Sequence, residues 1–450
     1  MARRDLWQEV HDRFDPEEAA QKEWRADRKS SPVEQICEAL DRPFGAPRVL
    51  LTGTVGTGKT TELLRVAEQR AAAGKEFVIV LDLVRHFSGV VGDLEALQHI
   101  GSWEVCFLVG VALLRAAEER LGFTFTKEER DDLSKAWAAL AKETETATSE
   151  PQIDLSALAK SMVLLTSTAS PQGTALAAGL TVIDKVVDAV KWALPIGLGK
   201  RAPPDQDAAM QSLLASVNRL LGSFQIRAMP VLFVIDGLDR IRSAERARAL
   251  FLESEMIGRL VCRLVVCGPW ALRHDKSVSA VRRFSTLCTL VNEPVLLETD
   301  PSQHGPGVGF FCDVFHQRVN DLGGGDLIPD ALLRRLAYYS GGRARDFVRS
   351  IRMLAARAWD AGADKATEAL VDRVIDEARR LMETGIDRGD IALLAAVAND
   401  PVHELPDGEK ARELLSYGHL LPYPNGSEWF YPHPLLTIRK IRKPPAGPSA

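Results

Sequence analysis

The chain has 450 residues, of which 46% are hydrophobic and 26% are charged, an ordinary globular balance that leaves room for two or three domains. Its 56 Lys and Arg residues are offset by 61 Asp and Glu residues, which excludes an overall positive field drawing the whole molecule to nucleic acid or anionic membrane. The 6 cysteines occur singly, without the spacing of a zinc site or redox pair, so we expect reduced core residues. No apolar leader or membrane-length run occurs, so we expect a cytoplasmic protein without a membrane span.

The first part of the chain predicts outlying helices followed by buried strands. Residues 1–30 are charged and contain Trp7, Phe14 and Trp24, which favours short helices on the outside of a domain. Apolar runs at 48–52 and 77–83 have the length of strands, and the helix between them ends near Gly74. Such runs are typical of a βαβ unit with buried parallel strands. Further strands predicted at 231–235, 264–267 and 295–297 complete a five-stranded α/β core.

Residues 85–229 form a long connection between the second and third predicted strands. Sequential strands of one sheet do not need so many residues, so this insertion must contain structure of its own. Helices are expected over 101–121 and 127–142, and a flexible loop over 143–151. A valine-rich helix over 182–194 presents one apolar stripe. Packing against a neighbouring helix is the favoured interpretation of that stripe, and contact with a membrane surface or partner is the alternative.

The chain becomes helical after the last predicted strand. Helices are expected over 310–322, 330–339, 344–361 and 367–382. From Gly385, two helices over 391–398 and 409–417 and a hairpin with an Asn-Gly turn over 420–431 are typical of a winged helix. The final residues, rich in proline, are expected to be disordered.

The strand at 48–52 leads into Gly-Thr-Val-Gly-Thr-Gly-Lys-Thr, which satisfies the pattern of a phosphate-binding P-loop. An apolar strand precedes it and an amphipathic helix follows it, as this chemistry requires. The three glycines let the backbone turn tightly, so that its N–H groups and the positive end of the helix face phosphate oxygens. Lys59 would reach the β- and γ-phosphates and Thr60 would bind magnesium. The predicted nucleotide-binding residues are Gly53, Thr54, Val55, Gly56, Thr57, Gly58, Lys59, Thr60 and Thr61.

A P-loop should be accompanied by an acidic residue at the tip of an adjacent buried strand. Asp236 follows the apolar run 231–235 and is predicted to hold Mg²⁺, usually through water. Asp239 is either the general base that polarises the attacking water or an ion-pair partner of Arg240 or another nearby arginine. The phosphate motif alone fits ATP and GTP equally, but no guanine-reading Asn-Lys-x-Asp motif occurs. We therefore expect ATP and Mg²⁺ as cofactors.

Two sequences carry a family resemblance. Asp-Gly-Leu-Asp-Arg at 236–240 resembles the second acidic motif of NACHT and KAP-type NTPases of the STAND class. Ser-Gly-Gly-Arg-Ala-Arg-Asp at 340–346 resembles the motif that opens a lid helix in AAA+ ATPases of the origin-recognition and helicase-loader group. That resemblance implies that Arg345 is the sensor-2 arginine, which reads the γ-phosphate from the lid. The alternative is a surface arginine on an arginine-rich helix.

The resemblance extends to one further position and fails at another. The sequence Ser-Ala-Val-Arg-Arg-Phe at 279–284 resembles the element that carries an arginine finger, which implies that Arg283 acts on the nucleotide of a neighbouring subunit; a helix-end arginine is the alternative. The sensor-1 position after 264–266 usually holds Asn, Ser or Thr, whereas this chain has Cys267. That departure favours a slow, timer-like ATPase over a motor. A nucleotide-binding scaffold that hydrolyses little stays an alternative.

The expected fold is α/β: a P-loop NTPase core with a parallel sheet and a helical insertion, followed by a helical lid and a C-terminal winged helix. The predicted boundaries run in chain order. They are an N-terminal helical segment (1–30), the ATPase core (31–300) with its insertion (85–229), the lid (301–384), the winged helix (385–441) and a disordered tail (442–450).

The resemblance implies an ATP-driven switch that couples nucleotide state to conformational change or oligomerisation, in bacterial signalling or defence against phage. The expected partners are a second copy, through Arg283, and another protein, through the insertion. The alternative is a DNA-associated loader or remodeller that uses the winged helix. DNA is not favoured, because basic residues of that domain are concentrated only at 439–443. His433, between two prolines, is expected to contact the P-loop domain rather than a metal.

Overall fold

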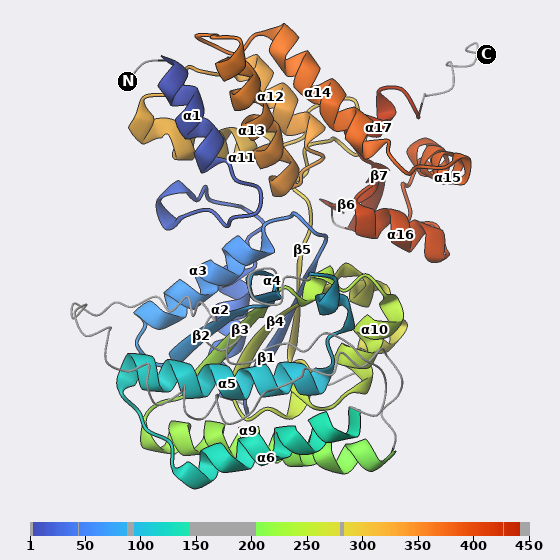
Figure 1. The fold of residues 1–450 in the computed structure, drawn as a ribbon. Helices are drawn as coiled ribbons and strands as arrows, with labels where there is room; N and C mark the ends of the chain where they lie inside the picture. Colours follow the sequence, from blue (N-terminus) through green and yellow to red (C-terminus); the bar gives the residue numbers. More distant parts are fainter. Residues whose placement is uncertain are drawn as a thin grey trace. The chain divides into compact units, whose positions relative to one another are not determined.

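The structure is a computed structural model that describes residues 3–43, 45–87, 94–144, 204–279, 283–425 and 427–441 (Figure 1). The valine-rich helix predicted at 182–194, nearly all of the predicted loop at 143–151 and the proline-rich tail lie outside these ranges. The chain divides into two compact units. The sheet unit comprises Pro32–Thr52 and Glu62–Thr289, and the helical unit comprises Met1–Ser31, Gly53–Thr61 and Leu290–Ala450. The domain boundaries expected from the sequence stay predictions beside this division.

Five strands form one sheet: β1 (Arg48–Gly53), β2 (Phe77–Asp82), β3 (Val231–Asp236), β4 (Arg263–Pro269) and β5 (Thr286–Leu290). Their order across the sheet is β2-β3-β4-β1-β5. The β2–β3 and β3–β4 pairs are parallel. The first four strands are buried along almost their whole length, which explains why each appears in the sequence as an unbroken apolar run.

The predicted fifth strand, at 295–297, is wrong. These residues make only an isolated bridge, between Leu296 and His304, and the fifth strand is β5. Along β5 the exposed Leu287 alternates with the buried Cys288 and Leu290. A half-exposed strand at the edge of a sheet mixes polar and apolar residues, so it lacks the continuous apolar signal of the inner strands.

The expectation that Asp236 ends a strand adjacent to the P-loop strand is also wrong. Asp236 ends β3, and β4 lies between β3 and β1. On its other side β3 pairs with β2, in a register that sets Asp236 opposite Asp82. The apolar runs predict which segments are strands but contain no information about their order, so this neighbour relation had to come from the structure.

The insertion after β2 extends the core of the sheet unit (Figure 1). The predicted helices are confirmed as α5 (Ser102–Leu121) and α6 (Lys127–Thr144), and a further helix, α9 (Pro204–Arg227), leads to β3. Helix α5 packs on β2 and α9, and α9 packs on α6. The rings of Phe224 in α9 and Phe77 in β2 lie 5.3 Å apart, so the insertion shares the apolar core of the sheet. The shorter helices of this unit are α2 (Val33–Asp41), α4 (Leu83–His86) and α10 (Ala244–Arg248), and α3 (Lys59–Ala72) follows the loop after β1.

The N-terminal segment is part of the core of the helical unit. Its helix α1 (Arg3–Arg13) packs on α13 (Ala344–Asp360), and the Trp7 indole N–H donates to the carbonyl oxygen of Ala363 at 2.7 Å. Trp7 and Phe14 are fully buried. The other helices of this part are α11 (Val308–Val319), α12 (Asp330–Tyr339) and α14 (Glu368–Met382). The four predicted lid helices are therefore present at almost the expected positions.

The C-terminal residues contain the two predicted helices and the predicted hairpin. Helices α15 (Arg388–Asn399) and α16 (Glu409–Tyr417) precede β6 (Leu420–Asn425), which pairs antiparallel with β7 (Ser427–Pro432), and α17 (Pro434–Thr437) follows. The Tyr423 hydroxyl of β6 donates to the carbonyl oxygen of Gly341 at 2.9 Å. This bond joins the hairpin to the turn before α13. The winged-helix assignment stays a prediction.

Candidate functional site

The glycine-rich loop at 53–58 joins the buried strand β1 to helix α3. Gly56 and Gly58 have φ angles of 92° and 98°. These angles favour glycine, because a residue with a Cβ is sterically strained at positive φ. Gly53 is needed for a different reason, since a Cβ at this position would collide with the carbonyl oxygen of Leu290. Each of the three glycines of the motif therefore has its own structural cause.

The side chains of the loop close it on itself. Lys59, the first residue of α3, is 4% exposed, and its Nζ donates to the carbonyl oxygens of Gly53 at 3.0 Å and Thr54 at 2.6 Å. The Thr57 hydroxyl donates to the carbonyl oxygen of Thr54 at 3.0 Å. Strand, glycine loop, buried lysine and helix follow one another as a phosphate-binding loop requires, on a sheet with parallel strands. The chain therefore has an α/β fold in which a loop with the backbone form of a P-loop follows β1.

Three successive carbonyl groups of the P-loop accept hydrogen bonds from other parts of the helical unit. Val55 accepts from Arg343, whose Nε lies at 3.1 Å and whose second guanidinium nitrogen lies at 2.8 Å. Gly56 accepts from the backbone N–H of Arg345 at 3.0 Å, and Thr57 accepts from Arg28 at 2.8 Å. The loop is therefore fixed on its carbonyl side by the N-terminal segment and by the start of α13.

Arg345, the predicted sensor-2 arginine, adjoins the P-loop through its backbone. A Cβ added to Gly56 would lie only 3.2 Å from the Cβ of Arg345, so the two backbones pass close to each other. The Nε of Arg345 donates to the carbonyl oxygen of Pro16 at 3.2 Å. Within this motif, the guanidinium that binds the loop belongs to Arg343, two residues earlier, which is 8% exposed. The motif thus supplies two arginines at the P-loop, and the γ-phosphate role of Arg345 stays a prediction.

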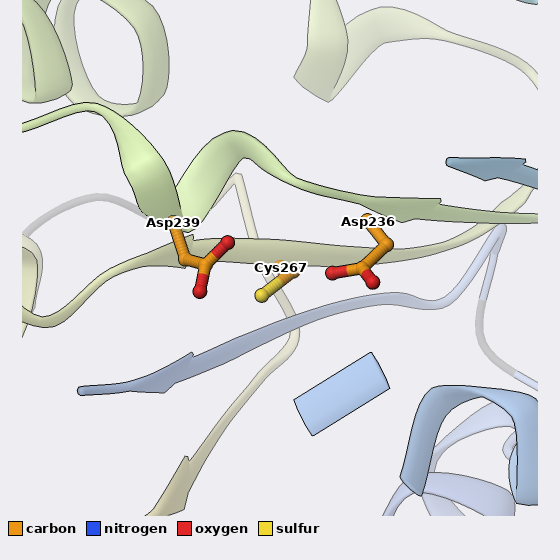
Figure 2. A group of neighbouring side chains, drawn as sticks. All are labelled: Asp236, Asp239 and Cys267. Carbon is orange, nitrogen blue, oxygen red and sulfur yellow. The ribbon is translucent and has the colours of Figure 1, made fainter. Parts of the chain in front are cut away.

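Asp236, Asp239 and Cys267 lie together in the sheet unit (Figure 2). One ligand atom of each lies within 4.8 Å of the others. Asp236 comes from the end of β3, Asp239 from the short helix that follows it (Leu238–Arg240), and Cys267 from β4. Asp236 is 5% exposed and Cys267 is fully buried. The structure therefore groups the predicted magnesium ligand, the predicted base and the cysteine at the predicted sensor-1 position.

A tight turn sets this geometry. Gly237 has a φ of 99°, and a Cβ there would crowd the side chain and backbone of Val84. Its N–H donates to the Asp236 carboxylate at 2.8 Å. Carboxylate oxygens are the ligands that Mg²⁺ prefers, whereas a neutral thiol suits it poorly. The two aspartates therefore fit a magnesium ion, and Cys267 lies beside them without supplying a suitable ligand.

Arg283, the predicted arginine finger, is turned towards its own unit. Its guanidinium donates to the carbonyl oxygens of Leu252 and Ser254, at 2.8 Å for the latter. Its side chain also packs on Gly258. Action on a second subunit would require these bonds to break, and that role stays a prediction. The preceding Arg282 lies outside the described residues.

His433 is fully buried at the start of α17 and contacts α13, one of the predicted lid helices. Its Nδ1 accepts from the N–H of Leu435 at 3.3 Å, and its Nε2 faces a carboxylate oxygen of Asp346 at 3.7 Å. Burial lowers the pKa of His433, which favours the neutral form of the ring. Burial alone would raise the pKa of Asp346, but the positive charge of Arg343 holds it well below its usual range. Within the helical unit His433 thus contacts α13, and the contact expected with the P-loop domain stays a prediction.

Four residues around the P-loop were not predicted from the sequence: Arg28, Asn292, Glu293 and Arg343. Arg343 stands inside the Ser-Gly-Gly motif, so a local signal existed. Arg28 forms a buried ion pair with Glu293, which is 265 residues away along the chain. The Thr54 hydroxyl donates to Asn292 at 3.1 Å, and Asn292 donates to the carbonyl oxygen of Pro422 at 3.2 Å. These pairings join distant segments and leave no pattern within either one.

Comparison with known proteins finds similarity among solved structures. Cdc6p of Pyrobaculum aerophilum is 14% identical, with 95% of each chain covered and a TM-score of 0.38. The ORC2 protein of Aeropyrum pernix, in its ADP form, is 13% identical, with 95% of this chain and 94% of that chain covered and a TM-score of 0.42. A point variant of RuvB from Thermotoga maritima is 12% identical, with 93% of this chain and 96% of that chain covered and a TM-score of 0.36.

Similarity at this level says nothing about what this chain does, and the description of the α/β sheet and its glycine-rich loop rests on the geometry given above. No protein-family model and no curated protein matches the chain. Within the described ranges, every helix is too short or too polar to cross a membrane. All 6 cysteines are free and buried, as expected.

Proposed function

We propose that this protein is a slow ATP-binding and ATP-hydrolysing switch of the AAA+/STAND kind. The observation that carries the proposal is the P-loop, whose Lys59 is buried at the start of α3 and whose carbonyl groups are held by the segment that opens the lid helix. A phosphate-binding loop bonded directly to a lid has the arrangement by which bound nucleotide can stabilise one lid position over another. Only such a difference in affinity between two conformations shifts their populations.

The roles proposed for the site residues follow from their chemistry. The N–H groups of residues 53–61 would bind the phosphates, and Lys59 would leave the two carbonyl oxygens it now contacts to bind the β- and γ-phosphates. Thr60 and Asp236 would hold Mg²⁺, which neutralises phosphate charge. Asp239 would orient and deprotonate the attacking water. Arg345 would read the γ-phosphate from the lid.

Slow turnover is proposed because of Cys267. Its thiol lies beside Asp236 and Asp239, where a hydroxyl or amide group would donate a stronger hydrogen bond to water or phosphate. A low hydrolysis rate suits a switch that must stay in one state for some time. The same residue keeps a nearly inactive nucleotide-binding scaffold as the neighbouring hypothesis.

The test is hydrolysis and molecular mass of the purified protein, measured with ATP and Mg²⁺ and with ADP. The proposal predicts slow release of phosphate and a larger particle or a changed shape with ATP only. Assembly in the ATP state that Arg283→Ala abolishes would support the proposed arginine finger. ATP binding without detectable phosphate release would favour the scaffold, and absence of ATP binding would contradict both.

A DNA-associated ATPase is the second candidate, and one observation favours it. Arg439 and Lys440 are exposed beside α17, in a basic run that continues into Arg442 and Lys443 outside the described residues. DNA that stimulates hydrolysis, with salt-sensitive binding that is lost when these four residues are neutralised, would replace the first candidate by this one. The cellular setting in signalling or phage defence is tested by phage plating on bacteria that express the wild type or Lys59→Ala.

A further inference from the structure

We infer that Arg28 and Arg343 are positioning residues of the nucleotide site, which hold the P-loop amides in their phosphate-binding orientation from the opposite side. The inference rests on the proposed function and adds to it two groups that do not touch nucleotide themselves. Arg28 lies in the N-terminal segment and Arg343 in the turn before α13, so segments remote in sequence would set the affinity of the loop. All contacts involved lie within the helical unit.

The geometry of the peptide bond carries the first step. In a trans peptide the C=O of one residue and the N–H of the next point in opposite directions. Fixing the carbonyl groups of Val55, Gly56 and Thr57 therefore fixes the N–H groups of the residues that follow them. Those are Gly56, Thr57 and Gly58, the donors that a phosphate-binding loop uses.

Arginine side chains hold the first and the last of these three carbonyl groups. Arg343 donates twice to Val55, at 3.1 and 2.8 Å, and Arg28 donates once to Thr57, at 2.8 Å. The middle carbonyl, of Gly56, is held by the backbone N–H of Arg345 at 3.0 Å. Substitution can remove the two outer supports, whereas the middle one persists in any variant that folds.

The Arg28 side chain is buried and held in place by several polar groups. Its side chain is 2% exposed and forms an ion pair with Glu293, whose own side chain is 7% exposed. The Ser30 hydroxyl donates to the same carboxylate at 2.8 Å, and the backbone N–H of Glu293 donates to the carbonyl oxygen of Gly342 at 3.0 Å. A buried guanidinium that is anchored in this way has a fixed direction, so the bond to Thr57 is preorganised.

Arg343 is oriented by Asp346 and by the C-terminal part of the unit. Its third nitrogen forms an ion pair with Asp346 at 2.9 Å, and Asp346 faces the buried His433 at 3.7 Å. A Cβ on Gly418 would collide with the guanidinium of Arg343, so the C-terminal part approaches it closely. The support at Val55 therefore depends on Asp346 in α13, on Gly418 just after α16 and on His433 just before α17, and displacement of the C-terminal part would loosen the loop.

The experiment uses the full-length protein and compares two variants that each remove one support of the loop, called the support-removing variants, with two matched controls. Arg28→Gln combined with Glu293→Gln removes both charges of the buried pair together, and Arg343→Gln removes the support at Val55. Arg343→Lys keeps a charge beside Asp346 but loses the paired donors, in case Arg343→Gln does not fold. The controls are Arg13→Gln and Arg352→Gln, since these arginines bond Asp321 and Asp15 within the same unit without reaching the P-loop.

The readouts are the Kd for ATP, measured with Mg²⁺, and amide hydrogen exchange at residues 56–58 in the nucleotide-free protein. Each support-removing variant should raise the Kd for ATP about tenfold, which is the effect of losing one charge-assisted hydrogen bond. Each should also increase the rate of hydrogen exchange at these three amides. The controls should leave both readouts unchanged. A purely structural role for the arginines would lower thermal stability without changing exchange at 56–58 selectively.

Two results would overturn the inference. The support-removing variants could bind ATP as tightly as the wild type does, or the controls could weaken ATP binding as much as the support-removing variants do. A wild type that binds no ATP would instead contradict the proposed function. Exchange at residues 56–58 would then still decide whether Arg28 and Arg343 order the loop, because that measurement needs no nucleotide.

Discussion

The thiol of Cys267 lies within 4.8 Å of a carboxylate oxygen of Asp239. The two residues come from different parts of the sheet unit, Cys267 from β4 and Asp239 from the short helix after β3. In the proposed hydrolytic site, we expect Cys267 to limit the rate, because a stronger hydrogen-bond donor at this position would reach the water that Asp239 is proposed to orient.

Replacing Cys267 should therefore increase hydrolysis. Cys267→Ser and Cys267→Asn supply a hydroxyl and an amide in place of a weak thiol donor, and we expect at least one of them to raise kcat about tenfold, the equivalent of one added hydrogen bond. Steady-state phosphate release measures the effect. Cys288→Ser is the control, since Cys288 is buried in β5 outside the cluster. Lower kcat in both variants at unchanged ATP affinity would contradict this role.

Asp239→Asn should separate binding from hydrolysis. The amide keeps the size of the side chain but cannot accept a proton, so we expect kcat to fall by about 10²–10⁴-fold while the Kd for ATP changes little. Single-turnover hydrolysis and titration calorimetry measure the two effects. Asp132→Asn is a matched control, because Asp132 pairs with Arg219 elsewhere in the same unit. If Asp239→Asn hydrolyses ATP as fast as this control, another group is the base.

Glu104 should make stability depend on pH in the neutral range. Burial raises the pKa of this carboxyl group, which caps α5 by accepting from the N–H of Gly101, to about 8. The unfolded chain loses this proton near its ordinary pKa of 4.5, whereas the folded protein keeps it until about 8. The contribution of Glu104 to stability is therefore fully present below the unfolded pKa, declines as pH rises, and is lost once pH passes the folded pKa.

Glu104→Gln should remove that decline, since an amide oxygen can still accept from Gly101 and carries no titratable proton. Urea unfolding at a series of pH values measures it, with Glu119→Gln, on the partly exposed side of the same helix, as control. We expect the variant to gain stability over the wild type as pH rises. A parallel decline in Glu104→Gln and wild type would show that other groups cause the pH dependence.

Trp7 should be a large contributor to the stability of the helical unit. Its side chain is fully buried and donates to Ala363 at 2.7 Å, so Trp7→Ala leaves a cavity and an unpaired carbonyl group. We expect a loss of about 3–5 kcal/mol in the free energy of unfolding. Trp359→Ala tests a tryptophan that is 39% exposed in the same unit and should cost much less. Equal losses would mean that the N-terminal helix does not share the core.

The inner strands and the P-loop were predictable because their signals are local. Buried strands appear as continuous apolar runs, and the glycines, Lys59 and Thr60 of the loop occur within eight successive residues. Edge strand β5 was missed because half of it faces outward, as Leu287 does. The order of strands, the Arg28–Glu293 pair and the grouping of Cys267 with Asp239 depend on which distant segments meet. Contacts between distant segments form only in the folded chain, and the spacing of residues within either segment does not predict them.

Titration calorimetry of ATP binding, in the presence of Mg²⁺, to the wild type and to Lys59→Ala tests the central claim most directly. Lys59 is the one positive side chain within the P-loop, and its Nζ already lies against the loop carbonyl groups of Gly53 and Thr54. We predict saturable binding of one ATP by the wild type and none by a Lys59→Ala variant that stays folded. Equal affinity in the two proteins, or no binding by the wild type, would contradict the claim that this loop captures a nucleoside triphosphate.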